Sequence, residues 1–223
     1  MKTFSFQHFL WRILNFLSVS LFLLFVSCKP SLSIKAGNND EAQIFFSTGF
    51  SAASARTIQS VSGGDSESPL FNKKDVISLL ESAGMVSVTA NLPSATEVTT
   101  SAKIPELSKN PLAQTGLLST KEKTLSLALG PKQISAFYEL LNEDGKSYLD
   151  LLMIPALIGE KMTTSEYREL LASMYGPSFA DEIVNGKLSI QLVSPDGKKS
   201  LKKEISLGEL LTAENELIWS LRF

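Results

Sequence analysis

Residues 163–205 read TTSEYRELLASMYGPSFADEIVNGKLSIQLVSPDGKKSLKKEI, and this stretch decides the fold class. It opens on a capping box at residues 163–166, and the apolar residues that follow keep helical spacing as far as Gly176, which predicts a helix. A short second helix is predicted over residues 179–184. The remainder alternates between apolar and polar residues on both sides of the turn Pro195-Asp196-Gly197, which predicts a β-hairpin.

The segment upstream also contains helix and strand patterns. A strand, a helix, a second helix capped by Asn72 and a pair of alternating strands are predicted at residues 42–46, 51–61, 72–84, 85–90 and 97–104. Apolar residues in the second helix fall at i, i+3, i+4 and i+7, and Gly84 follows where a helix would end. This part of the chain therefore has both helical and strand periodicity.

Residues 105–123 contain Pro105, Pro111 and Gly116, so they predict a linker. Further strands and helices are predicted at residues 125–129, 131–141, 148–158 and 216–223. The helix over 148–158 is nearly all apolar, and we expect it to be buried, with Pro155 kinking or ending it.

Hairpins with helices grouped between them predict an α+β fold, with antiparallel sheet of hairpins and a central group of helices. Whether 42–104 and 124–223 form two subdomains or one continuous domain stays open.

The first 27 residues differ from the rest of the chain. They contain two basic residues, Lys2 and Arg12, and no acidic residue, and an almost wholly apolar run follows over 13–26. This order is typical of a secretory signal peptide. At 14 residues the run is shorter than the roughly 20 that a membrane-spanning helix needs. We therefore predict that residues 1–27 are a signal peptide.

The leader ends in Leu24-Phe25-Val26-Ser27-Cys28, which resembles the lipobox of bacterial lipoproteins. The resemblance implies lipid attachment to the Cys28 thiol and cleavage between Ser27 and Cys28. Phe25 departs from the pattern, which usually has Leu at that position. Cys28 is the chain's only cysteine, and an exported protein has little use for a single free thiol.

Residues 28–41 then predict a lipidated N-terminus followed by a polar tether. The resemblance implies a protein held in the cell envelope by its N-terminal lipid. Lys29 follows the cysteine, where Asp commonly favours the inner membrane, so in a cell with two membranes the resemblance favours the outer one.

Composition excludes several classes of function. The whole chain has 21 basic and 23 acidic residues, and loss of two basic residues with the leader leaves 19 and a net charge of −4. The chain has no long basic run, so we predict no nucleic-acid partner. The single histidine, His8, lies in the leader, and Cys28 is assigned to lipid. Histidine and thiol catalysis and the common metal centres are therefore not expected, and we predict no cofactor, metal site or catalytic residue.

Two further patterns resemble catalytic motifs, but we favour a structural interpretation of each. Ser200-Leu201-Lys202-Lys203 matches the Ser-x-x-Lys of penicillin-binding enzymes, but it falls on a predicted strand, where those side chains face opposite ways. Asp181 with Glu182, or Glu166 with Glu169, would supply paired carboxylates, although acids are also expected at helix starts.

Aromatic residues gather in the helical region 131–184, where they would form core or line an apolar cleft. They are Phe137, Tyr138, Tyr148, Tyr167, Tyr175 and Phe179.

Three functional hypotheses remain. The first is a non-enzymatic envelope lipoprotein that binds another envelope protein or supports an assembly. The second is a lipid-anchored carrier that holds an apolar small molecule between helices and sheet, in a pocket lined by residues such as Phe137, Leu152 and Met153. The third is a carboxylate-dependent hydrolase of envelope glycan.

Overall fold

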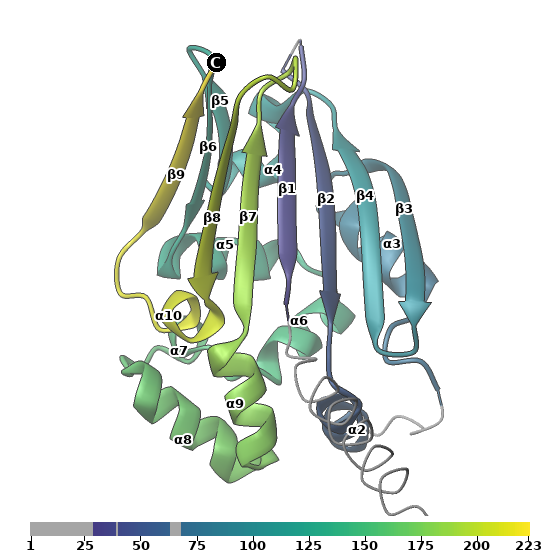
Figure 1. Cartoon of the computed structure of the whole chain (residues 1–223), viewed down its shortest axis with the longest axis vertical. Helices are drawn as coiled ribbons and strands as arrows, with labels where there is room; N and C mark the ends of the chain where they lie inside the picture. The colour runs from purple at the N-terminus through teal and green to yellow at the C-terminus, as the bar shows by residue number, and fades with distance from the viewer. Residues whose placement is uncertain (1–28, 39, 63–67) are drawn as a thin grey trace, which may run out of the picture.

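The computed structural model describes residues 29–38, 40–62 and 68–223. The predicted leader with His8 and the predicted cleavage and lipidation site at Ser27 and Cys28 lie outside these residues. Within them the chain has the α+β fold that the sequence predicts, with a six-stranded sheet and a three-stranded sheet (Figure 1). The predicted hairpins are present, and so is one parallel strand pair that was not predicted.

The larger sheet has the order β3-β4-β2-β1-β7-β8. Its strands, in chain order, are β1 Ser31–Ala36, β2 Ala42–Gly49, β3 Val86–Ser94, β4 Glu97–Ile104, β7 Lys187–Val193 and β8 Ser200–Ser206. Neighbours are antiparallel except β1 and β7, which run parallel with Ile34 opposite Leu192. This parallel pair joins the beginning of the described chain to its C-terminal hairpin.

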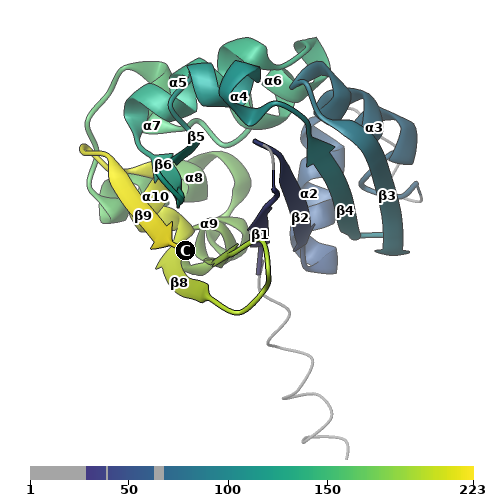
Figure 2. The ribbon, with the colours of Figure 1, turned by 90° about the horizontal axis from the view of Figure 1, so that it is seen from above.

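The smaller sheet has the order β5-β6-β9, and its strands are β5 Leu118–Lys121, β6 Thr124–Leu129 and β9 Leu217–Arg222. Seen from above, the strands of both sheets curve around one side of the molecule, and α3, α4, α5 and α6 lie across the hollow side (Figure 2). The inner face of the larger sheet therefore meets helices.

The prediction of a tether over residues 28–41 is wrong for Ser31–Ala36, which form β1 in the middle of the larger sheet. Ile34 and Ala36 are each 1% exposed. The sequence has the alternation that buries these two residues in a strand. The polar Ser31, Ser33 and Lys35 beside them and the nearby turn residues made the segment look like a tether. Because β1 hydrogen-bonds on both edges, this segment is part of the fold.

The predicted linker over 105–123 also carries structure. It contains a 3-10 helix η2 Leu107–Lys109, a short helix α4 Pro111–Gln114 and strand β5, and Leu107, Leu112 and Leu118 are buried. The larger sheet takes strands from both sides of this segment. This arrangement favours one continuous domain over two subdomains.

The principal helices are α2 Ala52–Val61, α3 Lys73–Ser82, α5 Pro131–Leu140, α6 Glu143–Asp150, α7 Pro155–Ile158, α8 Thr164–Tyr175, α9 Pro177–Asn185 and α10 Leu207–Leu211. Asn72 caps α3 and a capping box opens α8, as predicted. The predicted helix over 148–158 is wrong as one element: it is split between α6 and α7. The residue before Pro155 is driven out of the helical region, and Met153 takes a positive φ of 45°.

Two apolar clusters stabilise the domain. The larger lies on the inner face of the sheets and includes Ile34, Ile104, Leu125 and Ile190. The smaller joins α8 to α9 around Tyr167, which is completely buried. The first cluster holds the sheets to α4 and α5, and the second builds a helical layer at the end of the molecule where β1 begins (Figure 1).

Candidate functional site

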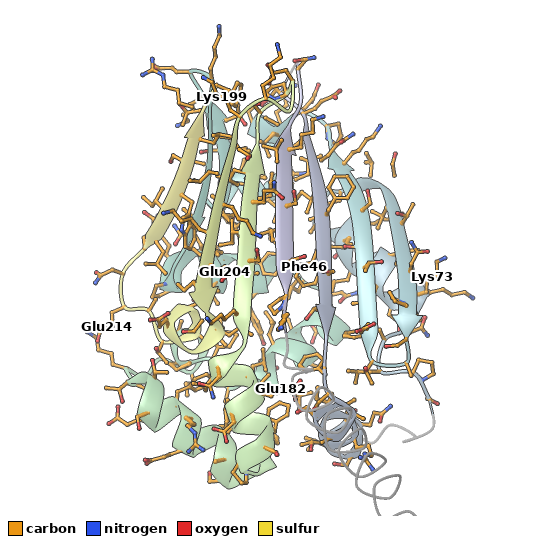
Figure 3. All side chains as sticks on the ribbon, viewed as in Figure 1. Phe46, Lys73, Glu182, Lys199, Glu204 and Glu214 are labelled. Carbon is orange, nitrogen blue, oxygen red and sulfur yellow. The ribbon has the colours of Figure 1, made fainter. Side chains whose placement is uncertain are left out.

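A cavity of about 340 Å³ lies between the inner face of the larger sheet and helices α2, α3 and α6. The sheet contributes Phe46 and Thr48 from β2 and Val98 and Thr100 from β4. Residues two apart in a strand face the same side, so each strand presents both of its lining residues inward. Figure 3 labels Phe46 on this part of β2.

Helix α3 forms the wall opposite the sheet. Val76, Leu79 and Leu80 line the cavity, and their spacing places them on one face of the helix. None of the ten residues of α3 is buried, although the helix is clearly amphipathic. We attribute this exposure to the cavity, because the apolar face of α3 borders open space where a packed helix would meet side chains.

Helix α6 closes the adjoining wall with Gly145 and Leu149. Asn142 caps this helix by accepting a hydrogen bond from the Gly145 N–H at 2.9 Å. A Cβ atom on Gly145 would lie 2.5 Å from Cδ1 of Leu79, so a larger residue at this position would push the Leu79 side chain aside. Gly145 of α6 and Leu79 of α3 are therefore in close contact at this side of the cavity.

Aromatic and aliphatic residues close the end of the cavity nearest α2. Phe50 and Phe71 stack with ring centroids 6.3 Å apart, and Ile58 of α2 and Phe179 of α9 lie beside them. The backbone around them is held by hydrogen bonds from the Phe50 N–H to the carbonyl of Thr96 and from the Leu70 N–H to the carbonyl of Ala95. These bonds tie the segments before α2 and α3 to the β3–β4 turn.

Glu182 of α9 fixes α2 in position. Its carboxylate accepts hydrogen bonds from the Ser51 N–H at 2.7 Å and from the hydroxyls of Ser51 and Ser54 at 2.5 Å. Ser51 is also the N-cap of α2, so the carboxylate completes the cap from another helix. Figure 3 shows Glu182 where α9 and α2 come together.

The lining is almost entirely apolar. Among the described lining residues Asp75 is the one with a charged side chain, and it is exposed at the rim. Asn72 and Asn142 also line the cavity, but their side-chain oxygens already cap α3 and α6. The interior therefore offers hydrocarbon surface, with no free charge to bind an ionic group.

The aromatic residues singled out from the sequence divide between cavity and core. Phe179 lines the cavity and Tyr175 packs edge-on against it at 5.1 Å. Tyr167 is core: its hydroxyl donates to the carbonyl of Leu152 at 2.5 Å, and burial raises the pKa of Tyr167 well above its usual value. Phe137 packs against the larger cluster.

Two further members of that set have no part in the described lining. The hydroxyl of Tyr138 donates to Asp150 at 3.4 Å on the surface. The side chain of Tyr148 is outside the description. Of the three residues expected to line a pocket, Leu152 does so, whereas Phe137 and Met153 are not among the lining residues. The sequence predicted a cleft within residues 131–184, but most of the residues that line the cavity lie between 46 and 100.

The carboxylates singled out as possible catalytic pairs have structural roles, and the two members of each pair do not act together. Asp181 accepts from the Arg168 guanidinium at 2.6 Å, while its neighbour Glu182 caps α2. Glu166 closes the capping box of α8, where hydrogen bonds from the backbone and hydroxyl of Thr163 hold its pKa below the usual value. Glu169 is exposed on α8.

Ser200 and Lys203 lie three residues apart on strand β8, as predicted, so they face opposite ways. In the part of the chain that the structure describes, no group of three or more His, Cys, Asp or Glu residues could hold a metal ion. Within the same ranges, no helix is long and apolar enough to cross a membrane.

Comparison of the chain with protein-family models, with curated proteins and with solved structures found no match.

Proposed function

We propose that this protein is a lipid-anchored protein of the bacterial cell envelope that binds an apolar small molecule in the cavity between β2, β4 and helices α2, α3 and α6. The observation that carries the proposal is the apolar lining of a cavity of about 340 Å³. Ligand pockets commonly start at roughly 300 Å³, and apolar cavities of smaller size already take up apolar guests.

The driving force would be transfer of hydrocarbon from water to the cavity. Each methylene group that leaves water contributes about 0.8 kcal/mol, so a medium-length alkyl chain gains enough to offset the loss of its freedom. Charged and strongly polar molecules are disfavoured, because the lining is almost entirely apolar. We therefore assign the ligand to neutral or amphiphilic hydrocarbons, with any polar group left at the rim beside Asp75.

The anchor part of the proposal rests on the resemblance of residues 24–28 to a lipobox, with lipid on Cys28. The ligand would be held without chemical change, because the lining is almost entirely apolar. Binding through the cavity is preferred to binding a protein partner through a surface patch. Of the exposed large apolar residues, Phe45, Val86 and Ile218 lie on three different strands, and Val61, Ile158 and Met174 lie on three different helices.

A pair of substitutions on α3 tests the cavity. Val76→Trp places an indole in the cavity, whereas Ile77→Trp places it on the same helix at a half-buried position outside the lining. The delipidated protein is titrated with N-phenyl-1-naphthylamine, whose fluorescence rises in apolar surroundings. We expect saturable binding by the unmodified chain and by Ile77→Trp, and at least a tenfold loss of affinity, about 1.4 kcal/mol, in Val76→Trp. Equal binding by both variants would refute the cavity as the site.

A further inference from the structure

A lipid on Cys28 would lie very close to the folded domain, because residues expected to form a tether form strand β1. Pro30 is buried and its carbonyl accepts a hydrogen bond from the Ser189 N–H at 2.9 Å, so Pro30 is already part of the fold. Cys28 stands two residues before Pro30, which limits the distance between their Cα atoms to about 7–8 Å. A lipid on Cys28 would hold the adjacent end of the domain directly against the membrane.

The end of the domain next to Cys28 is the helical end. Ser31 of β1 pairs with Ser47, and β2 leads from there through Phe50 into α2. Helices α2, α8 and α9 gather at this end, whereas Lys199 and the β7–β8 turn lie at the other (Figures 1 and 3). The position of β1 therefore determines which end would face lipid.

Helices at this end expose large apolar side chains. Val61 at the end of α2 is 49% exposed, and Met174 in the last turn of α8 is 58% exposed. Such residues can enter the boundary between lipid headgroups and acyl chains. Val61 lies one helical turn beyond Ile58, which lines the cavity.

We propose that this helical end, defined by Val61 and Met174, is a membrane-contact surface that rests on the lipid bilayer holding the Cys28 anchor. The inference depends on the lipid anchor of the proposed function. Through so short a connection the effective concentration of the surface at the bilayer is on the order of millimolar or higher, so a few partly inserted side chains are sufficient. The surface also brings the α2 end of the cavity next to the lipid.

The contact is apolar in origin. Two basic side chains in this part of the molecule are in ion pairs, Arg168 with Asp181 and Lys161 with Glu214, and the mature chain would be mildly acidic. Attraction to anionic headgroups therefore contributes little, and the contact should persist in high salt.

The test uses the full chain, expressed with its leader, purified from membranes and reconstituted in phosphatidylcholine vesicles whose acyl chains carry bromine. Trp219 is replaced by Phe, and single tryptophans are introduced as Val61→Trp, Met174→Trp and, at the far end, Lys199→Trp. Bromine quenches only tryptophans that reach the acyl chains. We expect Val61→Trp and Met174→Trp to lose most of their fluorescence, in low and in high salt, and Lys199→Trp to lose none.

The outcomes separate this inference from the proposed function. Mass spectrometry of the purified chain shows whether Cys28 is the lipidated N-terminus, and an unmodified Cys28 refutes the anchor. With Cys28 lipidated, absence of quenching at both Val61→Trp and Met174→Trp overturns the membrane-contact surface. Equal quenching at Lys199→Trp overturns it too, because the domain would then have no fixed orientation.

Discussion

Two helical regions of the domain differ in how their apolar faces are packed. Helix α9 buries Phe179, Ala180, Ile183 and Val184; Phe179 also lines the cavity, and the other three form a solid cluster with α8. Helix α3 has a comparable apolar face but buries no residue, because that face borders the cavity. The comparison teaches that an amphipathic pattern predicts a helix and its inner face, but not whether that face meets side chains or a ligand.

The largest expected effect comes from truncating one leucine in each region. Leu171→Ala removes a fully buried side chain of α8 and should lower the free energy of unfolding by about 2–5 kcal/mol. Leu79→Ala on α3 should cost less than about 1.5 kcal/mol, since its side chain is only partly buried and faces open space. Urea unfolding followed by circular dichroism measures both, and equal losses would mean that α3 is packed as tightly as α8.

Next in size is the connection from α9 to α2 through Glu182. Glu182→Ala removes the acceptor of three hydrogen bonds at the start of α2, and we expect a loss of about 1–3 kcal/mol in stability. Faster hydrogen exchange in α2 than in α8 would localise the damage. Glu169→Ala on α8, where the carboxylate is exposed, is the matched control and should leave stability nearly unchanged. A loss as large in the control would remove the special role given to Glu182.

The smallest effect concerns pH and the capping box of α8. Hydrogen bonds from Thr163 lower the pKa of Glu166 in the folded chain, so its ionised form contributes stability above the ordinary pKa of a glutamate. This contribution is lost as pH falls through the lowered pKa. The melting temperature of Glu166→Gln should therefore lie slightly below that of the unmodified chain at neutral pH, and the two should converge in acid. A difference independent of pH would contradict the capping role.

Sequence reasoning found most elements because their signals are local. The Asn72 cap, the capping box at Thr163 and the Pro195-Asp196-Gly197 turn each mark an element that the structure contains. Strand β1 was missed because Ser31, Ser33 and Lys35 look like tether residues until the strands on both sides are known. Its place in the sheet depends on pairing with β7, more than 150 residues away in the chain.

The cavity was harder to predict for the same reason. Leu152 and Phe179 were identified as pocket or cleft residues, but Phe46, Phe50 and Phe71 were not, although they stand in a segment with clear strand and helix periodicity. Their apolar side chains carry the same local signal as core residues. Only the packing of α3 and α6 over the sheet leaves space between them.

The central claim, that the α3 region holds a ligand and the α8–α9 region does not, is tested most directly by NMR of Leu and Val methyl groups during titration with a long-chain alcohol. The account predicts saturable shifts for Leu79, Leu149 and Val98, which line the cavity, and little change for Leu171 and Val184 in the solid cluster. Uniform shifts in both regions, or none in either, would contradict it.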